Sequence, residues 1–92
     1  MEYIEGVMCG KHVITDRCVC ILPQQYATAP RSMMVRNSGN HRVYLGGTRM
    51  SPEQSVYLEK GEVMCLDNLT GIALYAMCDS GCSSEVRCLF LR

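Results

Sequence analysis

The two-residue rhythm of this sequence restricts its fold more than any other feature. Apolar and polar residues alternate in short runs, and Gly, Asn, Asp or Pro interrupts each run. No apolar repeat of about 3.6 residues persists for three helical turns. Alternation at a period of two is typical of β-strands, and the interrupting residues favour turns. The sequence therefore predicts an all-β protein.

The predicted strands are clearest from residue 18 onward. They cover residues 18–22, 32–37, 41–45, 55–59, 62–67, 72–78 and 85–91. Residues 72–78 are apolar on both faces, which favours a central strand. We expect a small single-domain β-sandwich or barrel of about six to eight short antiparallel strands, with an extended N-terminal arm.

The N-terminal part of the chain is less regular. Tyr3–Cys9 and Val13–Ile14 fit either short strands or an extended arm, and Pro23–Pro30 has the proline at both ends that a linker often has. We therefore divide the chain into residues 1–28, an N-terminal arm or short strands plus linker, and residues 29–92, a compact β domain. The short apolar runs of residues 1–28 are expected to form no core.

The charge pattern predicts which partners are absent. Nine basic and nine acidic residues cancel, and the basic ones are spread singly along the sequence. Nucleic-acid binding needs a basic excess or stripe, so no nucleic-acid partner is expected. The longest apolar run, Cys18–Leu22, is far below the roughly 20 residues of a membrane span. The first residues have no apolar stretch typical of a secretory signal, so we expect synthesis in the cytoplasm and no membrane partner.

Seven cysteines stand in the chain, mostly within apolar runs. An odd number without an export signal argues against a closed disulfide framework, and cysteine in such runs behaves as a small hydrophobe. Zinc bound by Cys18, Cys20, Cys78 and Cys82 is an alternative, but the tight knuckles of structural zinc sites are missing. Cys78 and Cys82 also flank the turn Asp79–Gly81 and form a candidate disulfide under oxidising conditions.

No catalytic motif is present in the sequence. His12 and His41 have no paired spacing, no serine has a nucleophile-elbow context, and no Gly-rich loop precedes a Lys-Ser/Thr pair. We therefore expect no enzyme activity, no cofactor and no metal site.

Tyrosine and arginine supply the candidate interface. Tyr44 and Tyr57 are predicted to point outward from their strands, near Arg36 and Arg42. Tyr and Arg often form the centre of protein interfaces. These four residues are the predicted binding site.

The chain from Ala29 onward resembles a family of small β-proteins encoded among the structural genes of tailed bacteriophages. The similar stretches are APRSMMVRNSGNHRVYLGG, SVYLEKGEVMCLDN, LYAMCDSG and EVRCLFL. Two features carry the resemblance: V-R-N-S-G followed by V-Y-L-G-G, and L-Y-A before a small turn and a terminal strand. The resemblance covers about two thirds of the chain. The cysteine content and the first 28 residues depart from the family pattern.

The resemblance implies a virion component, most simply a capsid decoration or cement protein that stabilises the head by protein–protein contacts. Its partners would be the major capsid protein or other virion proteins, and it would form a homo-oligomer, more readily a trimer than a dimer. The alternatives are a head-fibre or tail accessory module that binds a host surface glycan, a secreted disulfide-stapled binding module, and a metal-binding regulator.

Overall fold

The computed structural model describes residues 2–4, 7–22, 32–47, 50–51, 53, 55–67 and 73–91. These residues form nine strands and contain no helix long and apolar enough to cross a membrane. The strands are β1 Glu2–Ile4, β2 Val7–Ile14, β3 Val19–Leu22, β4 Ser32–Asn37, β5 Val43–Gly46, β6 Val56–Leu58, β7 Val63–Asp67, β8 Leu74–Cys78 and β9 Ser84–Leu91. The predicted linker Pro23–Pro30 lies outside the described residues.

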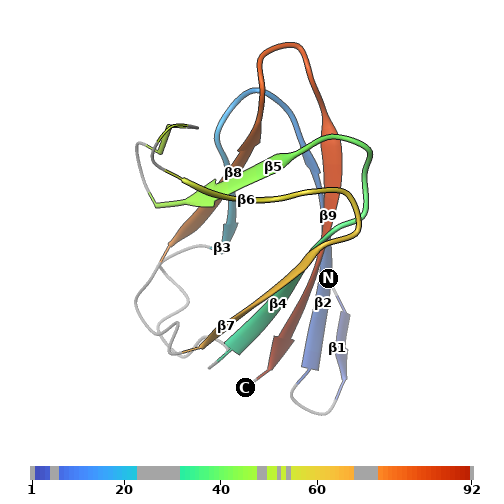
Figure 1. Ribbon diagram of the computed structural model, residues 1–92. Helices are drawn as coiled ribbons and strands as arrows, with labels where there is room; N and C mark the ends of the chain where they lie inside the picture. Colours follow the sequence, from blue (N-terminus) through green and yellow to red (C-terminus); the bar gives the residue numbers. More distant parts are fainter. Residues whose placement is uncertain are drawn as a thin grey trace.

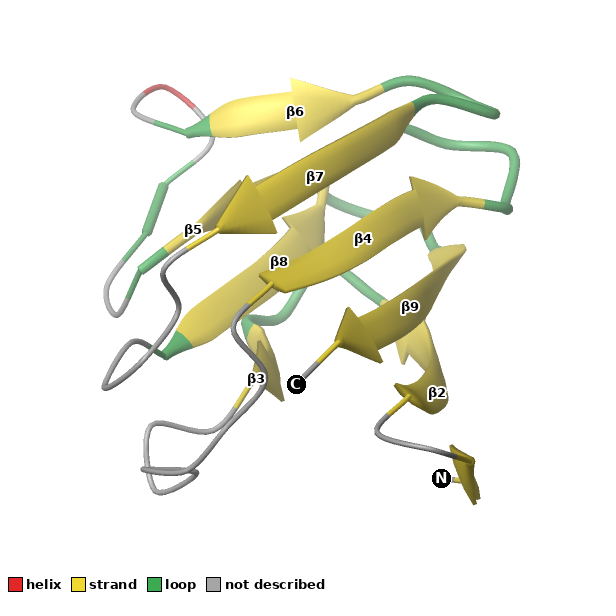
Figure 2. Ribbon diagram, turned by 90° about the horizontal axis from the view of Figure 1, so that it is seen from below, coloured by secondary structure: helices red, strands yellow, loops and turns green. Residues whose placement is uncertain are grey.

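The strands form two antiparallel sheets that face each other as two layers (Figures 1 and 2). Sheet A has the order β1-β2-β9-β4-β7, and sheet B has the order β3-β8-β5-β6. Apart from β5 to β6, each connection from β2 onward crosses from one sheet to the other. With β1 as a short extension at one edge, the other eight strands have the order of a double-sheet jelly roll. The all-β prediction is confirmed. Of the two predicted architectures, a sandwich or a barrel, the structure shows the sandwich.

Alternation along the strands sends one set of side chains between the two layers. In β4 the side chains of Met33, Val35 and Asn37 are buried, and those of Met34 and Arg36 are exposed. The core between the sheets is apolar, and its fully or nearly fully buried members are Ile14, Ile21, Leu22, Met33, Val35, Val43, Leu45, Leu58, Ala76, Cys78, Val86 and Cys88. This set fills the interior that a jelly roll encloses.

Within residues 7–22, the strands β2 and β3 belong to the body of the sandwich and do not form an extended arm. β2 pairs with β9 over eight residues, from Val7↔Leu91 to Ile14↔Ser84. Ile14, Ile21 and Leu22 are each 0–1% exposed. The expectation that this segment contributes no core is therefore wrong, because Ile14, Ile21 and Leu22 belong to the core between the two sheets.

A buried asparagine joins the two layers at one end of the sandwich. Asn37, 0% exposed, ends β4 and donates from Nδ2 to the carbonyl oxygens of His41 (2.8 Å) and Leu58 (2.9 Å). Its Oδ1 accepts from the amide of Gly39 (3.1 Å) and from Ser84 Oγ (2.7 Å). All four hydrogen-bonding positions of the amide are therefore used.

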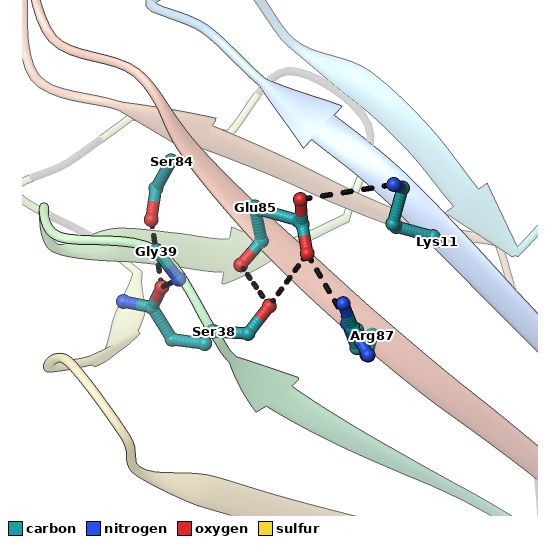
Figure 3. A network of polar contacts seen from close by, with 7 residues as sticks. Lys11, Ser38, Gly39, Ser84, Glu85 and Arg87 are labelled. Carbon is teal, nitrogen blue, oxygen red and sulfur yellow. Dashed lines mark hydrogen bonds and ion pairs between the residues drawn. The ribbon is translucent and has the colours of Figure 1, made fainter.

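The turn after Asn37 passes very close to β9. A Cβ atom on Gly39 would lie 2.0 Å from Ser84 Oγ and 2.5 Å from the amide nitrogen of Glu85. The side chain of Ser38 donates to the carbonyl and carboxylate oxygens of Glu85 in the same region (Figure 3). The Asn-Ser-Gly sequence thus fixes the turn through side-chain bonds and through the absence of a side chain at Gly39.

Candidate functional site

The outer face of sheet B carries a cluster of Arg42, Tyr44, Tyr57 and Glu59, here called the tyrosine–arginine cluster. Tyr44 and Tyr57 are cross-strand partners on β5 and β6, with ring centroids 6.0 Å apart in an edge-to-face arrangement. The Arg42 guanidinium lies over the Tyr57 ring, 4.1 Å from its centroid, and forms an ion pair with Glu59. The hydrogen bond that Arg42 donates to the Glu59 carboxylate raises the pKa of Arg42, which therefore stays charged.

The exposed part of this cluster is Tyr57 and the charged pair. Tyr57 is 48% exposed, whereas Tyr44 is 7% exposed. Tyr44 points outward as predicted but is covered, because β5 is an inner strand and Tyr57 and Met77 flank it across the sheet. Aromatic pairs in such a geometry contribute about 0.5–1.5 kcal/mol beyond area burial. Tyr44 therefore packs against Tyr57 and stabilises the position of the exposed ring.

Of the four predicted interface residues, the structure brings together three. Arg36 lies on the outer face of β4 in sheet A, the opposite layer. The sequence reasoning also missed Tyr75 and Met77, which share the outer face of sheet B with the cluster and are partly exposed. Their strand is apolar on both faces, so no local pattern indicates that one of its faces is exposed to solvent.

The described interior offers apolar side chains instead of ligands. No group of three or more His, Cys, Asp or Glu among the described residues could hold a metal ion. His12 faces inward on β2 beside Val86, and its Nε2 is buried without a hydrogen-bond partner in the described part of the chain. Burial lowers the pKa of His12 below its ordinary value, so its neutral form is favoured.

The cysteines divide by position in the sandwich. Cys78 and Cys88 are buried, and burial raises the pKa of each thiol to about 11. Cys18 and Cys65 are exposed, since Cys18 precedes β3 and Cys65 lies on the outer face of the edge strand β7. For these two the prediction of core-like thiols is wrong. Cys78 and Cys82 flank the predicted turn and are both free thiols.

We expect an alkylating reagent at about pH 8 to label Cys18 and Cys65 in the native protein, and Cys78 and Cys88 only after denaturation, because the thiolate is the reactive form.

The raised pKa values of the Cys78 and Cys88 thiols also predict that the protein loses stability at alkaline pH. The folded state favours the protonated thiols, so their stabilisation is complete below pH 9.0 and is lost as the pH rises towards 11. Peptide mass spectrometry and urea unfolding at increasing pH measure both effects. Equal native labelling of Cys18 and Cys88 would contradict the assignment.

Comparison with protein-family models and with curated proteins gives no match. Solved structures do match in fold. A cupin-2 domain containing protein from Shewanella frigidimarina has a TM-score of 0.60 and 9% identity over 99% of this chain and 76% of its own. CoII HppE in complex with substrate has a TM-score of 0.64 and 10% identity, with 94% of this chain and 45% of that chain covered. The stem and receptor binding domain of spike protein P1 from bacteriophage PM2 has a TM-score of 0.62 and 12% identity, with 87% and 31% covered.

These similarities define the class of fold and no more. The chain is an all-β sandwich similar to cupin structures and to a bacteriophage spike domain, and it spans less than half of the HppE and spike chains. One of these structures carries cobalt(II). Among the residues that the structure describes, no group of three or more His, Cys, Asp or Glu could hold such an ion.

Proposed function

We propose that this protein is a bacteriophage virion structural protein that acts by binding other proteins and not by catalysis. In this proposal it decorates the capsid, is made in the host cytoplasm and ends in the virion. It binds the major capsid protein or another shell protein through the tyrosine–arginine cluster. It stabilises the head by these contacts.

One observation supports the assignment of the tyrosine–arginine cluster as the binding surface. Arg42 stacks on a half-exposed tyrosine that is itself backed by a buried tyrosine. Tyr and Arg lose little conformational freedom when they are already held in this way, so less entropy is lost on binding. The core of the sandwich is filled by apolar side chains, which leaves its outer faces for recognition.

Two further points support a virion role. The segments V-R-N-S-G and V-Y-L-G-G, on which the resemblance to phage structural proteins rests, form β4, its turn and β5. A domain of a bacteriophage spike protein is among the structures of similar fold.

Edge strands β6 and β7 expose Val56 and Val63, and such edges favour association. Homo-oligomerisation, with a trimer favoured over a dimer, is part of the proposal.

Co-sedimentation with empty capsids of the phage that encodes this chain tests the proposal. Tyr57→Ala and Arg42→Ala should each weaken binding by about thirtyfold, the loss of about 2 kcal/mol typical of a central interface residue. Lys60→Ala, at the exposed turn between β6 and β7, is the matched control and should bind as the unchanged protein does. Light scattering should give the mass of an oligomer. A monomer with no affinity for the shells would refute the proposal.

A glycan-binding tail or head-fibre accessory is the second candidate. The observation that favours it is the exposed aromatic ring beside a charged pair, together with the similarity to a spike receptor binding domain. Binding to host surface glycans, lost in Tyr57→Ala and absent towards capsids, would select this candidate over capsid decoration.

A further inference from the structure

The register of sheet A places three basic residues in one row across three neighbouring strands. Lys11 on β2 is the partner of Arg87 on β9, and Arg87 is the partner of Arg36 on β4. Neighbouring strands lie about 4.8 Å apart, so the outer members of this basic row are about 10 Å apart at the backbone. In the sequence these residues are far apart and each stands alone.

The basic row is exposed and only partly neutralised. The side chains of Lys11 and Arg87 are 61% and 66% exposed, and Arg36 is also exposed. Among the described residues, Glu85 is their one acidic ion-pair partner, 3.2 Å from Arg87 and 4.0 Å from Lys11 (Figure 3). Like charges on directly opposite strand positions repel. Glu85 supplies one negative charge against three positive ones, so the row keeps a positive excess.

An apolar row runs beside the basic row on the same face. Met34 on β4 has Leu89 on β9 and Cys65 on β7 as its cross-strand partners. Met34 is 40% exposed, Leu89 is half-buried and Cys65 is exposed. Asp67 lies on the same strand as Cys65, one row further from the cations. The outer face of sheet A thus combines positive charge with accessible apolar side chains.

We propose that the outer face of sheet A binds an acidic polypeptide segment, with carboxylates on the basic row and apolar side chains on Met34 and Leu89. This inference does not depend on the function proposed above, which uses the opposite layer. The occupant follows from charge complementarity and from the adjoining apolar row. Arg and Met are both enriched in protein interfaces.

A nucleic acid fits this face less well. Phosphate backbones are bound by many basic groups along a strand, whereas this row has three and a carboxylate within it. The apolar row would lie against polar sugar and phosphate groups and would gain no apolar contact. An acidic peptide uses both rows.

Fluorescence anisotropy with a fluorescein-labelled peptide of glutamate and leucine tests the inference. K11E, R36E and R87E should each lower the affinity by about tenfold, because each replaces an attraction by a repulsion. K60E makes the same change of net charge at the turn after β6 and should lower the affinity by less than about twofold, since that site lies outside the row. Added salt should weaken the binding.

One substitution should act in the opposite direction. Glu85→Gln removes the negative charge from the row and keeps an acceptor for Ser38, so the affinity for the acidic peptide should rise by about threefold to tenfold. A merely structural role of Glu85 would not produce a gain. Equal losses in K60E and R36E, no gain in E85Q, or tighter binding of a single-stranded oligonucleotide than of the peptide would each overturn the proposal.

Discussion

Asn37→Ala should lower the free energy of unfolding by about 2–6 kcal/mol. The substitution leaves Leu58 O and Ser84 Oγ without their buried partner, and each such group costs about 1–3 kcal/mol. A domain of this length has a total stability of about 5–14 kcal/mol, so the loss is a large part of the whole. Urea unfolding followed by circular dichroism measures it as a lower midpoint.

Asn40→Ala is the matched control for that experiment. Asn40 stands three residues later in the same turn, is exposed, and has no side-chain hydrogen bond within the described residues. Its loss should change the stability by less than about 0.5 kcal/mol, as surface substitutions usually do. If the two variants unfold at the same urea concentration, Asn37 is not the joint between the layers that its four bonds indicate.

The strands were predictable from local pattern, because alternation and turn residues act over a few neighbours. β4 has the bounds that the pattern predicts, and β7 has Met64 and Leu66 inward as alternation requires. The role of Asn37 was not predictable, since a polar residue at the end of a strand most often turns to solvent. Its burial depends on β6 and β9, which lie far away in sequence.

The candidate sites show the same division. Tyr44 and Tyr57 pair across two strands that are consecutive in the sequence, so the alternation pattern could predict that they lie close together. The basic row was not, because it needs the first and last long strands, β2 and β9, to pair beside β4. Arg36 was placed with the tyrosines for the same reason: the sequence contains no indication of which sheet each strand joins.

The N-terminal strands provide the largest expected effect on folding. Deletion of residues 1–22 should abolish the cooperative unfolding transition and the strand signal in circular dichroism. It removes Ile14, Ile21 and Leu22 from the core, and burial of three such side chains contributes about 5–9 kcal/mol. This is comparable with the total stability of about 5–14 kcal/mol. β9 would also lose β2, one of its two partner strands, and would keep only β4.

Deletion of residues 1–4 separates this effect from a general sensitivity of the terminus. It removes β1, which pairs only with β2 at the edge of sheet A. The shortened chain should keep a cooperative transition, because β2, β3 and the core remain. A chain without residues 1–22 that still unfolded cooperatively would mean that residues 32–91 fold alone and that β2 and β3 are an attached arm. The complete burial of Ile14 and Leu22 between the layers argues for the opposite result.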